Sequence, residues 1–124
     1  MPSQLILVVE DYDEVRRLVR GILAEDGYRV IAVGDGAAAV LESERHAGAI
    51  DLILTDIVLP DVSGRDLATR ITATNPRASF LYMSGRPADE LLDLGVVADA
   101  HFLKKPFSSS ELLHAVKRLI GSPL

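Results

Sequence analysis

Five short apolar runs alternate along the chain with segments that have helical periodicity. Each run is unbroken and does not alternate with polar residues, which is typical of strands that are buried on both faces of a sheet. The predicted strands are Leu5–Val9, Val30–Val33, Leu52–Thr55, Phe80–Met83 and His101–Leu103.

The segment after the first run has the clearest helical period. Its apolar residues recur every three or four positions, at Val15, Leu18, Val19, Ile22 and Leu23. Asp13 is the predicted N-cap residue of this helix and Gly27 the predicted C′ residue. Arg16, Arg17 and Arg20 avoid the apolar stripe, and we interpret them as a solvated face.

The second helix is predicted from about Gly36 to His46. It is rich in alanine, and Val40 and Leu41 are its larger predicted core residues. A short fourth helix is expected around Ala88–Leu94.

The third and the last helices have clearer ends. The third opens near Ser63, Asp66 in its first turn favours the positive end of the helix dipole, and Pro76 ends it. Ser108 and Glu111 form the predicted capping box of the last helix. The predicted core residues of the two helices are Leu67, Ala68, Ile71, Leu112, Leu113, Val116, Leu119 and Ile120.

Five successive strand–helix units predict an α/β fold. Right-handed crossovers between parallel strands place helices on both faces of the sheet. The expected architecture is a doubly wound, five-stranded parallel sheet with the flavodoxin-like order 2-1-3-4-5. In such sheets ligands bind outside the carboxyl ends of the strands, where the order reverses. We expect a single domain over residues 1–124, with a core from about 4 to 121 and no output domain.

Composition and charge narrow the function. The chain has 124 residues, of which 48% are hydrophobic and 25% charged, as in globular domains. A formal net charge of -5 argues against nucleic acid as a partner, because phosphate backbones require clustered basic residues. The lack of cysteine excludes disulfides, thiolate metal sites and cysteine catalysis. No apolar run approaches the ~20 residues of a membrane span, so we expect a cytoplasmic protein with no membrane partner.

Acidic side chains follow two of the predicted strands. Glu10 and Asp11 come after the first run, and Asp56 comes after the third. These strands are expected to be neighbours in the sheet, so the three carboxylates should converge and repel one another. A hard divalent cation with oxygen ligands would relieve the repulsion, and Mg²⁺ is the expected ion, with Mn²⁺ as the alternative.

Two other strands end in polar residues at the same edge of the sheet. Ser84 ends the fourth strand, and Lys104 and Lys105 follow the fifth. Each residue alone would be interpreted as a cap, a turn former or a solvated charge. Together with the acidic residues, a hydroxyl and an ammonium group predict a site that handles a phosphoryl group.

These residues stand in motifs that resemble the receiver domains of two-component response regulators. The resemblance extends from Leu5 to Ile120 and includes features of receivers found in hybrid histidine kinases and in single-domain response regulators. The motifs are Leu-Val-Val-Glu10-Asp11, Leu-Thr-Asp56-Ile-Val-Leu-Pro60 with Gly64, Met83-Ser84-Gly85 and Phe102-Leu-Lys-Lys105-Pro106-Phe107.

The resemblance implies a phosphoacceptor and a metal site. Asp56 would accept a phosphoryl group from a histidine kinase or a histidine phosphotransfer protein. Asp11 and Asp56 would bind Mg²⁺ directly, and Glu10 would act on the ion through water. The backbone carbonyl of Val58 would be a third protein ligand.

The resemblance also implies a phosphate contact and a switch. Lys105 would contact a phosphoryl oxygen, with its bond to Pro106 in the cis form, while Lys104 would be solvated. Ser84 would hydrogen-bond another phosphoryl oxygen. Phe102, where many relatives have tyrosine, would then turn inward and change the surface formed by the fourth helix, fifth strand and fifth helix.

Two other functions compete with a phosphoacceptor. A degenerate receiver would be a phosphorylation-independent binding module, but the acidic, hydroxyl and lysine set is intact. A Mg²⁺-dependent phosphatase commonly has a second aspartate two residues after its nucleophile, where this chain has Val58. We therefore expect no separate substrate: the chain would catalyse only its own phosphorylation and dephosphorylation.

The expected partners are proteins. The resemblance places kinase docking on the first helix, at the edge formed by Arg16, Arg17 and Arg20. A downstream protein target and a monomer or weak dimer are also expected. The sequence specifies neither the kinase nor the target, and it fits both a stand-alone protein and a piece of a hybrid kinase.

Overall fold

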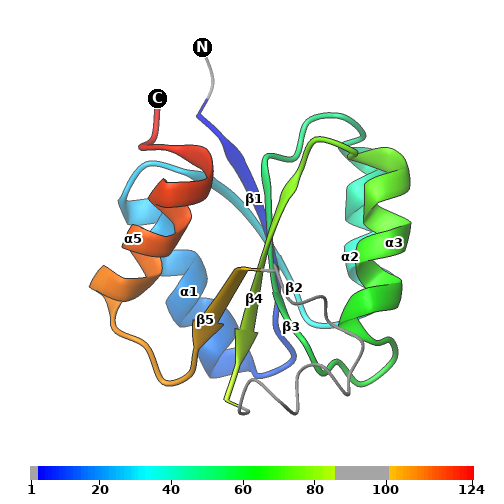
Figure 1. Cartoon of the computed structure of the whole chain (residues 1–124), viewed down its shortest axis with the longest axis horizontal. Helices are drawn as coiled ribbons and strands as arrows, with labels where there is room; N and C mark the ends of the chain where they lie inside the picture. Colours follow the sequence, from blue (N-terminus) through cyan, green and yellow to red (C-terminus); the bar gives the residue numbers. More distant parts are fainter. Residues whose placement is uncertain (1–2, 86–100) are drawn as a thin grey trace.

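The computed structural model describes residues 3–85 and 101–124, which form one parallel sheet with helices on both sides (Figure 1). The strands lie in the order β2-β1-β3-β4-β5, which confirms the predicted topology. The strands are β1 (Leu5–Val9), β2 (Arg29–Val33), β3 (Leu52–Asp56), β4 (Ser79–Ser84) and β5 (His101–Lys104). The helices are α1 (Asp13–Glu25), α2 (Gly36–Arg45), α3 (Gly64–Thr74) and α5 (Ser109–Ile120). The fourth helix expected around Ala88–Leu94 lies outside the described residues.

The sheet separates two apolar cores. Helices α1 and α5 cover one face, and α2 and α3 cover the other (Figure 1). In β1, Ile6 and Val8 pack toward α1 and α5, while Leu5, Leu7 and Val9 pack toward α2 and α3. Both faces of the strand are therefore buried, which explains why its sequence is an unbroken apolar run.

Polar side chains fix several helix ends as predicted. The Ser63 hydroxyl accepts a hydrogen bond from the backbone N–H of Asp66 and caps α3. Ser108 and Glu111 form a reciprocal capping box at the start of α5. Gly27 follows α1 with φ of 110°, a conformation that favours glycine and confirms its place beyond the helix end.

One prediction about a helix cap and one about a helix core residue are wrong. The N-cap of α1 is Tyr12, whose side chain makes no capping hydrogen bond, because Asp13 is already helical and its carboxylate pairs with Arg16. Leu41 is 55% exposed, because the face of α2 that packs on the sheet is centred on the fully buried Ala39. An alanine-rich helix lacks the strong apolar stripe that would identify its inner face.

The amino and carboxyl ends of the described chain lie together, away from the carboxyl ends of the strands (Figure 1). The Gln4 amide donates to the carbonyls of Ile120 and Ser122, and the Tyr28 hydroxyl donates to the carbonyl of Gly121. These bonds hold the end of α5 against β1 and β2. Over residues 3–85 and 101–124, no helix has the length and apolar character that crossing a bilayer requires.

Candidate functional site

The carboxyl ends of β1 and β3 bring three acidic side chains together. In the sheet Val9 pairs with Thr55, so the next residue of each segment, Glu10 after β1 and Asp56 at the end of β3, emerges at the same edge. Glu10, Asp11 and Asp56 each offer a carboxylate oxygen, and these oxygens lie within 4.8 Å of one another. The predicted convergence of the three carboxylates is confirmed.

Lys105 places its ammonium group between two of these carboxylates. Its Nζ atom donates to Oε1 of Glu10 at 2.7 Å and to Oδ2 of Asp56 at 2.9 Å. Burial lowers the pKa of Lys105, but the hydrogen bonds to Glu10 and Asp56 outweigh it, so the pKa is raised overall. Lys105 is therefore a permanent positive charge at the site.

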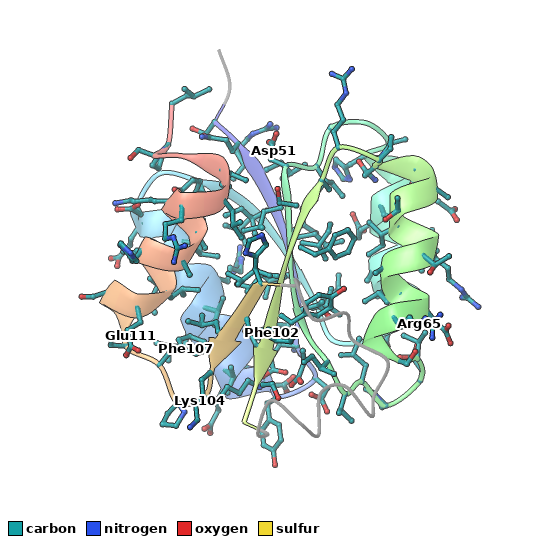
Figure 2. All side chains as sticks on the ribbon, in the orientation of Figure 1. Asp51, Arg65, Phe102, Lys104, Phe107 and Glu111 are labelled. Carbon is teal, nitrogen blue, oxygen red and sulfur yellow. The ribbon has the colours of Figure 1, made fainter. Side chains whose placement is uncertain are left out.

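The two consecutive lysines have different surroundings, as predicted. The Lys105–Pro106 peptide bond is cis. Lys104 is exposed and makes no contact with the acidic cluster among the described residues. Figure 2 shows Lys104 at the end of the molecule that lies opposite Asp51, where the strands finish.

Glu10 is the electrostatic centre of the cluster. Its side chain is fully buried, and its Oε2 atom has no hydrogen-bond partner among the residues that the structure describes. Burial, reinforced by the nearby Asp56 and opposed by Lys105, raises the pKa of Glu10 to about 7. The ionised form of Glu10 is therefore disfavoured, because the positive charge of Lys105 does not compensate for burial and for the nearby Asp56.

This donor set fits a hard divalent cation. With all carboxylates ionised, Glu10, Asp11 and Asp56 contribute three negative charges against the one positive charge of Lys105. Carboxylate oxygens are the ligands that Mg²⁺ prefers, and Mg²⁺ retains water positions that a phosphate can take. The unpartnered Oε2 atom of Glu10 has the chemistry to bind a water of such an ion.

Asp56 remains accessible within this cluster. Its side chain is 17% exposed. Oδ2 accepts from Lys105, and Oδ1 accepts from the backbone N–H of Val58 at 3.3 Å. Val58 itself is exposed.

The predicted switch residues lie on the neighbouring strands β4 and β5. Ser84 is buried at the end of β4, and its carbonyl accepts from the backbone N–H of Lys105 at 2.8 Å. Phe102 pairs with Tyr82 across the two strands, and their ring centroids are 5.9 Å apart. Phe102 is 38% exposed whereas Tyr82 is buried, so Phe102 is the more accessible member of this pair.

The solvated interpretation of Arg16 is wrong. Its guanidinium donates to the backbone carbonyl of Glu10 at 2.9 Å and pairs with Asp13, and its side chain is only 23% exposed. Arg17 and Arg20 are exposed, as predicted. Spacing along α1 could not identify this role, because the partner of Arg16 is a backbone carbonyl on the preceding loop.

Asp61 is a second residue whose role the sequence did not indicate. One carboxylate oxygen accepts from the N–H of Gly36 and the other from the N–H of Ala37, both at 2.9 Å. These two hydrogen bonds lower the pKa of Asp61. Its position after Pro60 indicates a turn, but no local signal reveals that the turn reaches another helix.

Comparison with known proteins agrees with this arrangement. Residues 6–117 match the family model of the response regulator receiver domain. The chain belongs to this family. It is 33% identical over 120 residues to the sensor kinase CckA of Brucella abortus, a match that covers 95% of this chain and 13% of CckA. It is 32% identical over 116 residues to the response regulator receiver protein CpdR of the same organism, covering 93% of this chain and 95% of CpdR.

Solved receiver structures have the same fold. The receiver domain of the sensor histidine kinase PA1611 from Pseudomonas aeruginosa superposes with a TM-score of 0.79 at 33% identity, covering 96% of this chain and 98% of that one. That structure has a magnesium ion coordinated in its active-site cleft. A receiver protein from Sinorhizobium medicae gives a TM-score of 0.82 at 32% identity, covering 95% of this chain and 94% of that one.

Membership of the family establishes the general role of this receiver domain. Receiver domains belong to two-component systems, bind Mg²⁺ in an acidic site and interact with histidine kinases or phosphotransfer proteins. The acidic cluster of Glu10, Asp11 and Asp56 is the corresponding place in this chain.

Proposed function

We propose that this receiver accepts a phosphoryl group on Asp56 from a phosphohistidine, in a Mg²⁺-dependent reaction. The observation that carries the proposal is the placement of Asp56, which is partly exposed and held between the ammonium of Lys105 and two other carboxylates. A carboxylate in such a place can attack phosphorus and form an acyl phosphate.

The transfer step is a displacement at phosphorus. An oxygen of Asp56 forms a bond to phosphorus as the phosphorus–nitrogen bond of the donor breaks. The electron pair of that bond stays on the imidazole, which takes up a proton from solvent. Lys105 stays charged throughout and holds an oxygen of the arriving group, while Ser84 donates its hydroxyl to another. Catalysis then consists of positioning and charge stabilisation, and the chain has no separate substrate.

Magnesium would be held by Asp11, Asp56 and the carbonyl of Val58, with Glu10 acting through a bound water. When bound, the ion would offset the negative charge of the carboxylates and of the phosphoryl oxygens. Mn²⁺ has the same preference for oxygen ligands and should replace Mg²⁺ in the reaction.

An apolar groove beside the site supports docking of the phosphohistidine donor there. The groove has a volume of about 410 Å³, and Lys105 and Pro106 form part of its wall. Leu18 on α1 also lines it and is 62% exposed, while Arg17 and Arg20 continue the exposed surface of α1. Leu18→Ala combined with Arg17→Ala should slow transfer from the cognate kinase and leave transfer from a small donor unchanged.

Phosphorylation would change the face that contains β5. Contact between Ser84 and a phosphoryl oxygen draws the end of β4 toward Asp56, and Phe102 turns inward beside Tyr82 to fill the space. A downstream protein would then bind a surface that differs between the two states, with the domain itself a monomer or weak dimer. Adding beryllofluoride, which mimics the phosphoryl group, should shift the ring proton resonances of Phe102.

Intact mass spectrometry tests the acceptor. The chain is incubated with acetyl phosphate with and without Mg²⁺, and Asp56→Asn is treated in parallel. One phosphoryl group should be gained only by the wild type and only with Mg²⁺. If no adduct and no beryllofluoride complex form, the domain is a phosphorylation-independent binding module.

A further inference from the structure

The β3–α3 loop, residues 57–63, carries the Val58 carbonyl and is closed tightly at its base. Val58 and Ser63 form an isolated antiparallel bridge. The backbone N–H of Gly64 donates to the carbonyl of Ile57 at 3.1 Å, and a Cβ on Gly64 would lie 3.2 Å from that same oxygen. The backbone at the base of the loop is therefore closely packed and has little space to adopt another conformation.

The tip of this loop is fastened to a different element, the amino end of α2. Asp61 uses both carboxylate oxygens to accept from the N–H groups of Gly36 and Ala37, each at 2.9 Å. Val62 packs so closely on Gly36 that a Cβ on this glycine would lie 2.0 Å from Cγ1 of Val62. A carboxylate at a helix amino end is also favoured by the helix dipole.

The segment that leads into α2 also contacts the backbone of Glu10. The carbonyl of Val33, at the end of β2, accepts from the N–H of Glu10 at 3.0 Å. The Arg16 guanidinium donates to the carbonyl of Glu10, and a Cβ on Gly34 would lie 3.0 Å from its Nη1 atom. The junction between β2 and α2 thus contacts both loops that supply metal ligands, although it supplies no ligand itself.

We propose that Asp61 is a positioning residue of the magnesium site, which holds the Val58 carbonyl in place by fastening the loop tip to α2. This inference rests on the magnesium site proposed above. Both oxygens of Asp61 are engaged by backbone N–H groups, so Asp61 acts through the loop and does not itself bind the ion. Residues that orient metal ligands in this way typically change metal affinity by about 10- to 100-fold when they are removed.

The chain contains a matched control for the capping role of Asp61. Asp35 is the N-cap of the same helix, and its Oδ1 atom accepts from the N–H of Ala38 at 2.7 Å. Asp35 belongs to the entry of α2, whereas Asp61 belongs to the loop with the metal ligand. Loss of either carboxylate should weaken the start of α2, but only the loss of Asp61 should release the loop.

Titration calorimetry with MgCl₂ and urea unfolding test the proposal on four proteins: wild type, Asp61→Ala, Asp61→Asn and Asp35→Ala. We expect Asp61→Ala to raise the Kd for Mg²⁺ about tenfold. Asp61→Asn should have an intermediate Kd, because its amide has only one acceptor oxygen. In Asp35→Ala the Kd for Mg²⁺ should stay within about twofold of the wild-type value. The urea midpoint of Asp35→Ala should nevertheless fall by as much as that of Asp61→Ala.

Two results would overturn the inference. One is an unchanged Kd for Mg²⁺ in folded Asp61→Ala and Asp61→Asn. The other is a loss of Mg²⁺ affinity in Asp35→Ala as large as that in Asp61→Ala, which would mean that Asp61 is only a helix cap. If the wild type itself fails to bind Mg²⁺, the proposed metal site fails as well, and this result is recognised before any variant is compared.

Discussion

The Nζ atom of Lys105 lies 2.9 Å from Oδ2 of Asp56, although 49 residues separate the two in the chain. The contact crosses from the end of β3 to the loop that follows β5. It fixes a positive charge against the carboxylate that we propose as the nucleophile. In the resting site Lys105 occupies a place from which it can hold an oxygen of an arriving phosphoryl group.

Lys105→Ala should slow phosphorylation by acetyl phosphate by about 100-fold, since one well-placed donor to a transition-state oxygen contributes about this much. The rate is measured by intact mass at saturating Mg²⁺. Lys104→Ala is the matched control, because its side chain is exposed and should leave the rate unchanged. Equal phosphorylation rates in wild type and Lys105→Ala would show that Lys105 does not contribute to the reaction.

Asp11→Asn should stabilise the domain in the absence of Mg²⁺ by about 1 kcal/mol, because it removes one of three mutually repelling carboxylates. Added Mg²⁺ at ten times its Kd should stabilise the wild type by about 1.4 kcal/mol and the variant by much less. Urea unfolding with Mg²⁺ or with EDTA measures both effects. A variant that is less stable than wild type in EDTA would contradict this description of the site.

Leu67→Ala should cost about 2–5 kcal/mol of unfolding free energy, since Leu67 is fully buried between α3 and the sheet. Leu41→Ala should change the same free energy by about 0.5 kcal/mol or less, because more than half of this side chain is exposed. Urea unfolding compares the two variants. Similar losses would mean that α2 buries a different face from the one observed.

The pH dependence of stability should report the two hydrogen bonds of Asp61. Its pKa is lower in the folded protein, so its ionised form stabilises the fold. This contribution is complete above the ordinary aspartate pKa of about 3.9 and is lost as the pH falls through the folded pKa. The gap in urea midpoint between wild type and Asp61→Asn should therefore be constant from about pH 7 to 5 and narrow as the pH falls below about 4. A gap that does not change over this range would contradict the role given to the carboxylate.

The sheet and the acidic cluster follow from the sequence because burial on both faces leaves a clear signal. An unbroken run such as Leu5–Val9 identifies an interior strand, and the order of a five-stranded parallel sheet then places Glu10, Asp11 and Asp56 at one edge. Hydroxyl caps are also local signals, and Ser108 with Glu111 gave the start of α5 correctly.

Features that depend on another element leave no such signal. Arg16 has the same spacing as a solvated residue, yet it binds the Glu10 carbonyl. Asp61 follows Pro60 as in many turns, and only the folded chain brings it to α2. Size alone favours Leu41 as a core residue, whereas the sheet contacts the smaller Ala39.

The most direct test of the account is to locate the phosphoryl group after transfer from a phosphorylated histidine donor. The acyl phosphate is reduced with borohydride, which converts the modified aspartate to homoserine, and the peptides are sequenced by mass spectrometry. The account predicts homoserine at position 56, with the reaction abolished by EDTA and in Asp56→Asn. Homoserine at position 11, or transfer that persists in Asp56→Asn, would contradict it.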